Sequence, residues 1–244
     1  MSSFNREVHP NISVLVVIAH PDDELFVSGT ICLLAASGFH LTLICATDGA
    51  GGHGRILSLN RASDACTHRK LELELSAKIL GIADVIHLGQ LDPCEIRTPE
   101  WRCEEVVERI ASEMKTRDVQ LVLTHGPDGG YGHPAHQLLY GLVINAANSS
   151  GFNGTIFSFC GLVPGTFFTW HMDEKSTLIV DGRAFHAQRS AAMGYHQSQL
   201  EYFVQPHLPC SIRKILSAIF GYFFWYFEFG ILLCVIFSDF AHIA

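Results

Sequence analysis

Residues 14–24 read Val-Leu-Val-Val-Ile-Ala-His-Pro-Asp-Asp-Glu, an uninterrupted apolar run that ends in a cluster of polar groups. The apolar part is short and rich in β-branched residues, which is typical of a strand buried on both faces of a parallel sheet. In such sheets, ligands bind at the carboxyl ends of the strands. The stretch therefore predicts a central parallel strand over 14–19, with a candidate site at 20–24 directly after it.

Apolar runs alternate with helical patterns along much of the chain. Further strands are predicted at 41–46, 84–88, 119–124, 155–159 and 177–180, and helices at 25–37, 69–80, 100–115, 136–147 and 183–196. A chain that alternates in this way forms an α/β fold with right-handed crossovers. We therefore expect a doubly wound, mostly parallel sheet.

The length and charge of the chain limit its organisation and its partners. The chain has 244 residues, enough for one sizeable core, so we expect one catalytic domain over 12–205 after a polar segment at 1–11. The net charge is −8, and the lysines and arginines are few and scattered. A phosphate-backbone binder needs a basic stripe, so the sequence argues against nucleic acid as a partner.

The segment 215–238 is apolar and carries a single charge, Glu228. A helix that rises about 1.5 Å per residue would span a bilayer core of roughly 30 Å over this length. The sequence therefore predicts a C-terminal hydrophobic helix at 211–238 that crosses the membrane once, and the alternative is a helix packed on the catalytic domain. Arg213 and Lys214 precede the run, which places the catalytic domain in the cytoplasm by the positive-inside rule.

Two of the predicted loops offer metal-binding side chains. His20, Asp22 and Asp23 follow the first strand, and His133 and His136 follow the fourth. A hydrolytic zinc ion needs three nitrogen or oxygen ligands and an open position for water, and His20, Asp23 and His136 satisfy that count for one ion. Adjacent carboxylates cannot easily point the same way, so Asp22 is expected to face the water as the general base.

The remaining histidines divide into two groups. His133 lies three residues before His136 at a predicted helix start, so it can share the site and either stabilise an oxyanion or protonate the leaving group. The isolated histidines are interpreted as turn or capping residues: His53, His87, His125 and His171. Asp22 and Asp23 could also be mere helix caps, but capping does not explain the second cluster of histidines.

These motifs resemble those of the zinc-dependent de-N-acetylases of the PIG-L and LmbE type. The matching segments are Ile18-Ala-His-Pro-Asp-Asp-Glu24, Thr47-Asp-Gly49, the arginine-led helix at 69–81, Gly132-His-Pro-x-His136 and His196-Gln-Ser-Gln199. The resemblance covers about 12–202 and implies a Rossmann-like LmbE fold. It also implies an amidase that removes the acetyl group from an N-acetylated amino sugar, such as a small or lipid-linked N-acetylglucosaminyl conjugate.

The resemblance also implies roles for individual residues. The zinc ligands are again His20, Asp23 and His136, with Asp22 as the base. Residues assigned to the acetyl carbonyl oxygen or to substrate binding by this likeness are Tyr131, His133, Arg69, Asp92, Asp48 and His196.

Ala135 stands where bacterial-type members carry an aspartate between the two histidines. A carboxylate there would orient an imidazole or tune its charge, so its absence is expected to slow catalysis without removing a ligand. Two alternatives stay open. The same two histidines and one carboxylate could hold Fe(II) for oxygen chemistry, or the protein could be a catalytically weakened, membrane-tethered sugar-binding protein.

Overall fold

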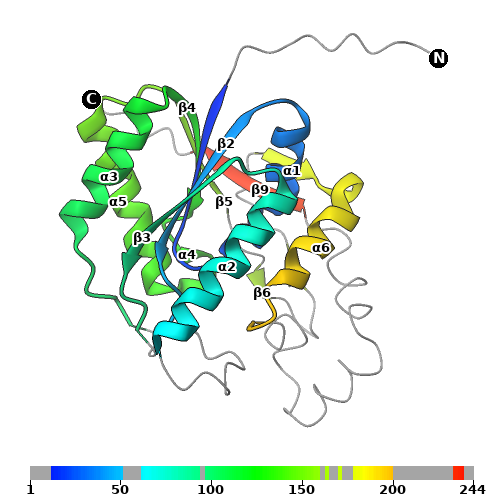
Figure 1. Cartoon of the computed structure of the whole chain (residues 1–244). Helices are drawn as coiled ribbons and strands as arrows, with labels where there is room; N and C mark the ends of the chain where they lie inside the picture. The colour runs from blue at the N-terminus through cyan, green and yellow to red at the C-terminus, as the bar shows by residue number, and fades with distance from the viewer. Residues whose placement is uncertain are drawn as a thin grey trace.

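The computed structural model describes residues 12–51, 62–93, 97–159, 163–164, 170–171, 178–199 and 233–238. The strands of the main sheet are β1 (Ser13–Ile18), β2 (His40–Thr47), β3 (Asp84–Gln90), β4 (Val119–His125), β5 (Thr155–Phe159), β8 (Leu178–Asp181) and β9 (Leu233–Ser238). Their order across the sheet is β3-β2-β1-β4-β5-β9-β8 (Figure 1). A separate pair consists of β6 (Val163–Pro164) and β7 (Trp170–His171).

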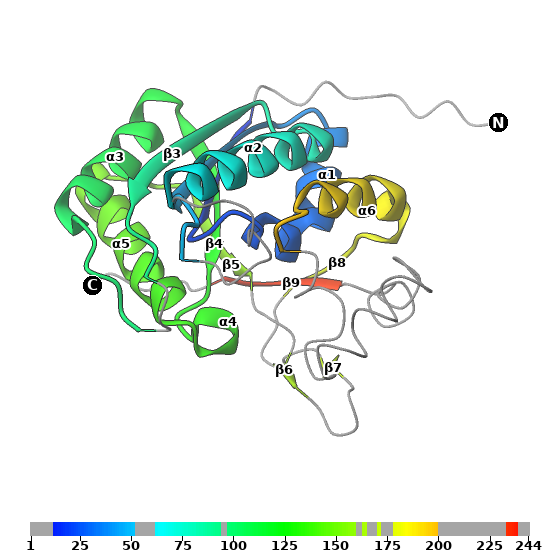
Figure 2. The same ribbon diagram turned by 60° about the horizontal axis from the view of Figure 1, so that its bottom comes forward.

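The five strands from β3 to β5 are parallel, and β9 runs antiparallel to both β5 and β8. The helices are α1 (Ser28–Ala36), α2 (Ala62–Leu80), α3 (Cys103–Thr116), α4 (Gly129–Gly132), α5 (Pro134–Ser150) and α6 (His186–Tyr195), with 3-10 turns η1 (Asp23–Val27) and η2 (Arg183–Phe185). Helices α1, α2 and α6 cover one face of the sheet, and α3 and α5 cover the other (Figure 2). The predicted α/β fold with a mostly parallel sheet is confirmed.

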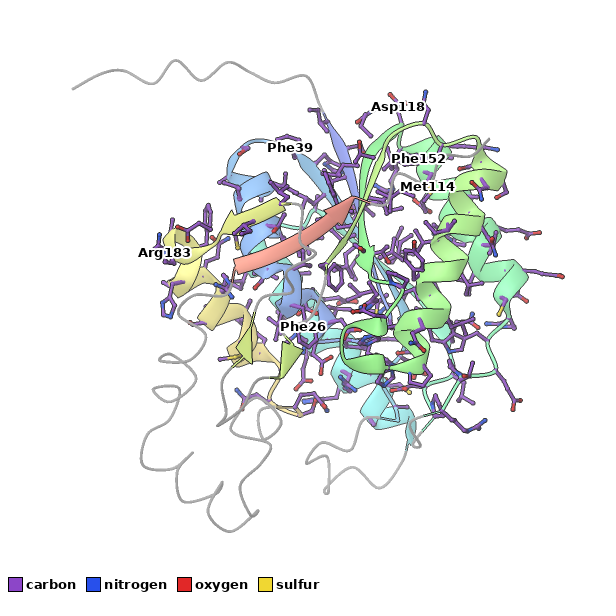
Figure 3. All side chains as sticks on the ribbon, turned by 180° about the vertical axis from the view of Figure 1, so that it is seen from behind. Phe26, Phe39, Met114, Asp118, Phe152 and Arg183 are labelled. Carbon is purple, nitrogen blue, oxygen red and sulfur yellow. The ribbon has the colours of Figure 1, made fainter. Side chains whose placement is uncertain are left out.

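The central strand β1 is apolar because it contributes to two cores at once. Val14, Val16 and Ile18 pack into the core under α1, α2 and α6, whereas Leu15 and Val17 face the core under α3 and α5. All five side chains are fully buried. Seen from behind, Phe39 lies on the side of the sheet covered by α1, α2 and α6, and Met114 lies on the side covered by α3 and α5 (Figure 3).

Helix α2 begins at Ala62, earlier than the predicted start at residue 69. The first turns of this helix carry only small apolar residues at helical spacing, Ala62, Ala65 and Cys66, which give a weaker signal than the leucines that follow. Its end is as predicted, because Gly81 follows the helix with a φ of 92°, a left-handed conformation that glycine adopts without strain.

The predicted C-terminal hydrophobic helix is wrong where the structure describes it. Residues Leu233–Ser238 form strand β9 between β5 and β8, while 211–232 lie outside the described residues. The apolar length of the run suggested a bilayer span, but apolar character alone does not distinguish a helix from a strand. Val235 and Ile236 are β-branched and suit a strand. Strand β9 pairs with the backbone hydrogen-bonding groups of β5 that would otherwise form an edge of the sheet.

The prediction of a single-pass, membrane-anchored protein with a cytoplasmic catalytic domain fails with that helix. Within the part of the chain that the structure describes, no helix is both long and apolar enough to cross a membrane. The orientation assigned from Arg213 and Lys214 depended on the same helix. The predicted membrane partner depended on that helix as well.

Two leucines on α2 provide a test of the core. Leu73 is fully buried, whereas Leu71 is 52% exposed on the same helix. We expect Leu73→Ala to lower the free energy of unfolding by about 2–5 kcal/mol, because it removes buried methyl groups and leaves a cavity. Leu71→Ala should change it by no more than about 0.5 kcal/mol. Urea unfolding of both variants measures the difference, and equal effects would contradict the described packing of α2.

Candidate active site

The polar loops at the carboxyl ends of the parallel strands meet at one edge of the sheet. Strand β1 pairs with β2 on one side and β4 on the other, with Val17 opposite Thr124. The loop after β1 therefore lies beside the loop between β4 and α5, which carries the second histidine cluster. This register explains how residues more than a hundred positions apart come into contact.

His20, Asp23 and His136 form a close triangle of donor atoms. His20 Nδ1 lies 3.3 Å from Asp23 Oδ2 and 3.3 Å from His136 Nε2, and His136 Nε2 lies 3.4 Å from Asp23 Oδ1. Ligands at about 2.0–2.1 Å from a tetrahedral zinc ion are separated by roughly 3.3–3.4 Å. The spacing of the three side chains thus fits a tetrahedral ion, although Asp23 uses a different oxygen toward each histidine.

Burial and hydrogen bonds hold these donors in place. Asp23 and His136 are 2% and 1% exposed. His136 Nδ1 lies 3.1 Å from the carbonyl oxygen of Gly129, which assigns the proton to Nδ1 and leaves the Nε2 lone pair for a ligand. Burial opposes ionisation of Asp23, but the imidazoles of His136 and His125 outweigh it and hold the pKa of this carboxyl well below its usual value.

His133 lies beside the triangle, with its ring centroid 4.8 Å from that of His20 and 4.5 Å from that of His136. Its Nδ1 accepts the backbone N–H of Ala135 at 3.3 Å. Burial and the neighbouring histidines lower the pKa of His133 to about 4, so the ring is neutral near pH 7, with its proton on Nε2. The backbone N–H of Ala135 thus contributes to the orientation of the His133 ring. The backbone of Tyr131 belongs to α4, and its side chain lies outside the described part of the structure.

Asp22 is held beside the triangle in a conformation that is rare for a residue with a Cβ. Its φ is 105°, in the left-handed half of backbone space. The guanidinium of Arg69 donates to Asp22 Oδ2 at 3.0 Å, to the carbonyl of Pro21, and to the carbonyl of Gly49 at 2.9 Å. Burial raises the pKa of Asp22 to about 6, although Arg69 acts in the opposite direction. A carboxyl group with a pKa close to neutral suits a general base.

The residues predicted to bind substrate fall at different depths. Asp92 Oδ1 lies 3.5 Å from His20 Nε2, so Asp92 reaches the site. Arg69 is only 3% exposed, and its guanidinium joins the loop after β1 to the loop after β2. Asp48 accepts the N–H of Ala50 at 3.1 Å, which stabilises its own loop. His196 is fully buried and contacts Glu24, so in this structure its ring has no access to a substrate, and the predicted substrate contact is corrected.

Sequence reasoning missed His125, which it interpreted as a turn or capping residue. His125 is 3% exposed, and its ring stacks on that of His136 with centroids 3.9 Å apart. Its Nε2 accepts the N–H of Ala19 at 3.1 Å and lies 3.3 Å from Asp23 Oδ2. His125 thus contacts two of the predicted ligands, and Asp23, His125 and His136 form a buried group whose donor atoms lie close enough together to hold a metal ion. The available signal was its position directly after the strand predicted at 119–124, at a carboxyl end where ligands bind.

Comparison with known proteins adds a family and a fold. The family model described as "PIG-L: GlcNAc-PI de-N-acetylase" matches residues 15–147. The chain is also similar to 1D-myo-inositol 2-acetamido-2-deoxy-alpha-D-glucopyranoside deacetylase 2 of Catenulispora acidiphila, with 32% identity over 158 residues. That alignment covers 57% of this chain and 52% of the relative, so the match spans about half the relative's length.

Two solved structures share the architecture. The N,N'-diacetylchitobiose deacetylase of Pyrococcus horikoshii superposes with a TM-score of 0.63 at 22% identity, covering 93% of this chain and 83% of that one. The 4-carboxy-2-hydroxymuconate hydratase of Pseudomonas putida KT2440 superposes with a TM-score of 0.65 at 18% identity, covering 96% and 98%. At such identities the likeness establishes the fold alone, and the reaction must be inferred from the side chains of the site.

The raised pKa of Asp22 predicts how stability depends on pH in the metal-free protein. The folded protein holds this proton up to about pH 6, whereas the unfolded chain loses it near pH 4, so the free energy of unfolding should fall as the pH rises through that window. Asp22→Asn removes this dependence. The free energy of unfolding of the variant, relative to that of the wild type, should therefore rise by roughly 2–3 kcal/mol between pH 4 and pH 7. Urea unfolding in chelator measures the gain, and a difference that stays constant with pH would contradict the raised pKa.

Proposed function

We propose that this chain, which belongs to the PIG-L family of GlcNAc-PI de-N-acetylases, is a metal-dependent hydrolase that removes the acetyl group from an N-acetylated amino sugar. The observation that carries the proposal is the triangle of His20, Asp23 and His136, with Asp22 beside it. The relative's name supports the substrate class, because it specifies a 2-acetamido-2-deoxy-glucopyranoside.

We propose zinc as the ion, one per chain, held by His20, Asp23 and His136. Two imidazoles and one carboxylate form a donor set typical of hydrolytic zinc, and the spacing of the donor atoms matches its tetrahedral geometry. Bound there, zinc would supply Lewis acidity to the acetamide carbonyl and to the attacking water. The ionised state of Asp23 at neutral pH supports its role as a ligand.

Asp22 is the proposed general base. Its carboxylate, fixed by Arg69, takes a proton from the water that attacks the acetyl carbon. As the carbon–nitrogen bond breaks, the same proton passes to the leaving nitrogen, and the products are acetate and a free amine. A pKa of about 6 suits both steps, because the group can accept the proton and release it again near neutral pH.

His133 is proposed to donate a hydrogen bond to the acetyl oxygen as negative charge develops on it. The N–H of Ala135 occupies Nδ1, so the donor is Nε2–H. Tyr131 is proposed to assist at the same oxygen. Asp92, whose other oxygen accepts the N–H of Gly51 at 3.2 Å, is proposed to accept a hydrogen bond from the sugar.

A deacetylation screen tests the function directly. The substrates are free N-acetylglucosamine and its inositol-linked, thiol-linked and lipid-linked conjugates, with acetate release and metal content measured on one preparation. Release of acetate by zinc-loaded protein without oxygen supports the proposal. Iron in the isolated protein and a requirement for oxygen would favour the Fe(II) alternative. Bound zinc and bound sugar without acetate release would favour a binding protein.

Two substitutions separate the base from the ligands. Asp22→Asn should keep the metal but lower kcat by roughly 10²–10⁴-fold, because an amide cannot accept the proton. Asp23→Ala should lose both metal and activity, because it removes a ligand. Metal analysis and initial rates on the same samples check both outcomes. Full activity in Asp22→Asn would overturn the assignment of the base, and a full metal complement in Asp23→Ala would overturn the assignment of the ligand.

Removal of the metal is a third test. Dialysis against a chelator should abolish acetate release, and stoichiometric zinc should restore it, since the proposed residues need the ion to polarise the carbonyl. Retained activity in protein shown to be metal-free would contradict a metal-dependent hydrolase.

A further inference from the structure

Glu24 is the third consecutive acid after Pro21, and it is completely buried. Its Oε1 accepts hydrogen bonds from Ser76 Oγ at 2.6 Å and from His196 Nε2 at 2.5 Å. Its Oε2 accepts the backbone N–H of Asp22 at 3.0 Å. One carboxylate thus joins α2, the end of α6 and the backbone of the proposed base.

The Asp22 backbone needs such support. A φ of 105° costs free energy in any residue that has a Cβ, so the surrounding contacts must maintain it. Arg69 holds the Asp22 side chain and the Pro21 carbonyl, whereas Glu24 holds the Asp22 N–H. The position of Glu24 therefore affects where the Asp22 carboxylate lies.

His196 can fix Glu24 because other contacts hold its own segment in place. Ser198 donates to Glu72 on α2 through both its N–H at 2.8 Å and its hydroxyl at 2.5 Å. The ring of His196 is fully buried, and its Nε2 is directed at Glu24. The structure thus offers a rigid imidazole that reaches Glu24 from 172 positions along the chain.

We propose that His196 is a positioning residue that acts through Glu24. Its hydrogen bond fixes the Glu24 carboxylate, which holds the Asp22 N–H and so keeps Asp22 in the left-handed conformation beside the metal ligands. The proposal rests on the proposed function of Asp22 as the base. It replaces a substrate contact with a role in orienting the proton acceptor, so its loss affects turnover rather than substrate binding.

Two substitutions of His196 by amide side chains of different length test the proposal. The side-chain nitrogen of His196→Gln stands near the position of Nε2 and can donate to Glu24, whereas that of His196→Asn stands near Nδ1 and falls short. We expect His196→Gln to keep kcat within about threefold of the wild-type value and His196→Asn to lower it at least about tenfold. KM and zinc content should stay within about twofold of the wild type in both variants. Gln188→Ala removes a partly buried hydrogen bond from α6 to the carbonyl of Ile79, so it should lower Tm but leave kcat within about twofold.

A double substitution shows whether the effect passes through Asp22. Adding His196→Asn to Asp22→Asn should lower kcat no further, because the base is already absent. A further tenfold loss in the double variant would overturn the proposal, as would equal kcat values for His196→Gln and His196→Asn.

The backbone itself gives a readout that is independent of activity. Crystal structures of the zinc-loaded wild type and His196→Asn should show Asp22 at positive φ in the first and displaced from it in the second. An unchanged Asp22 in the variant would overturn the proposal. If the wild type releases no acetate, the proposed function has failed, and this comparison still decides whether His196 positions Asp22.

Discussion

The three consecutive carboxylates that follow β1 are the constraint on which the rest of the site depends. Asp23 and Glu24 are buried, and the Asp22 side chain is 20% exposed. An unpaired buried charge is costly, so each acid needs its own partners. Asp22 has Arg69 from α2, Asp23 has the histidines around it, and Glu24 has Ser76 and His196. The helices on one face and the loop after β4 are arranged so that these partners arrive at the same edge of the sheet.

Much of this arrangement was predictable from the sequence. The apolar run at 14–19 and the alternation after it predicted the sheet, and the rule that ligands bind at carboxyl ends brought together His20, Asp23 and His136. The predicted helix boundary was wrong at the start of α2, where the apolar residues at helical spacing are small and the signal is weak. The strand β9 could not be foreseen, because a long apolar run indicates burial without specifying whether a lipid bilayer or a sheet edge supplies it.

The side-chain partners inside the site were the hardest to predict. A motif shows that a residue matters, but it does not show which way the side chain points. His196 and Arg69 were assigned to the substrate because they stand in motifs, and the structure buries both. His125 was set aside because it stands alone, yet it packs against His136. These outcomes depend on three-dimensional packing, which spacing along the chain does not encode.

The contact between Glu24 and His196 also bears on how the protein is made. It closes a loop of 172 residues, and long-range contacts of this kind form late because chain entropy opposes them. A nascent chain that has emerged only as far as α5 already contains His20, Asp23 and His136, yet it lacks the imidazole that holds Glu24. The hydrogen bond to Glu24 therefore cannot form until residue 196 has been added, 60 residues after the last of the three proposed ligands.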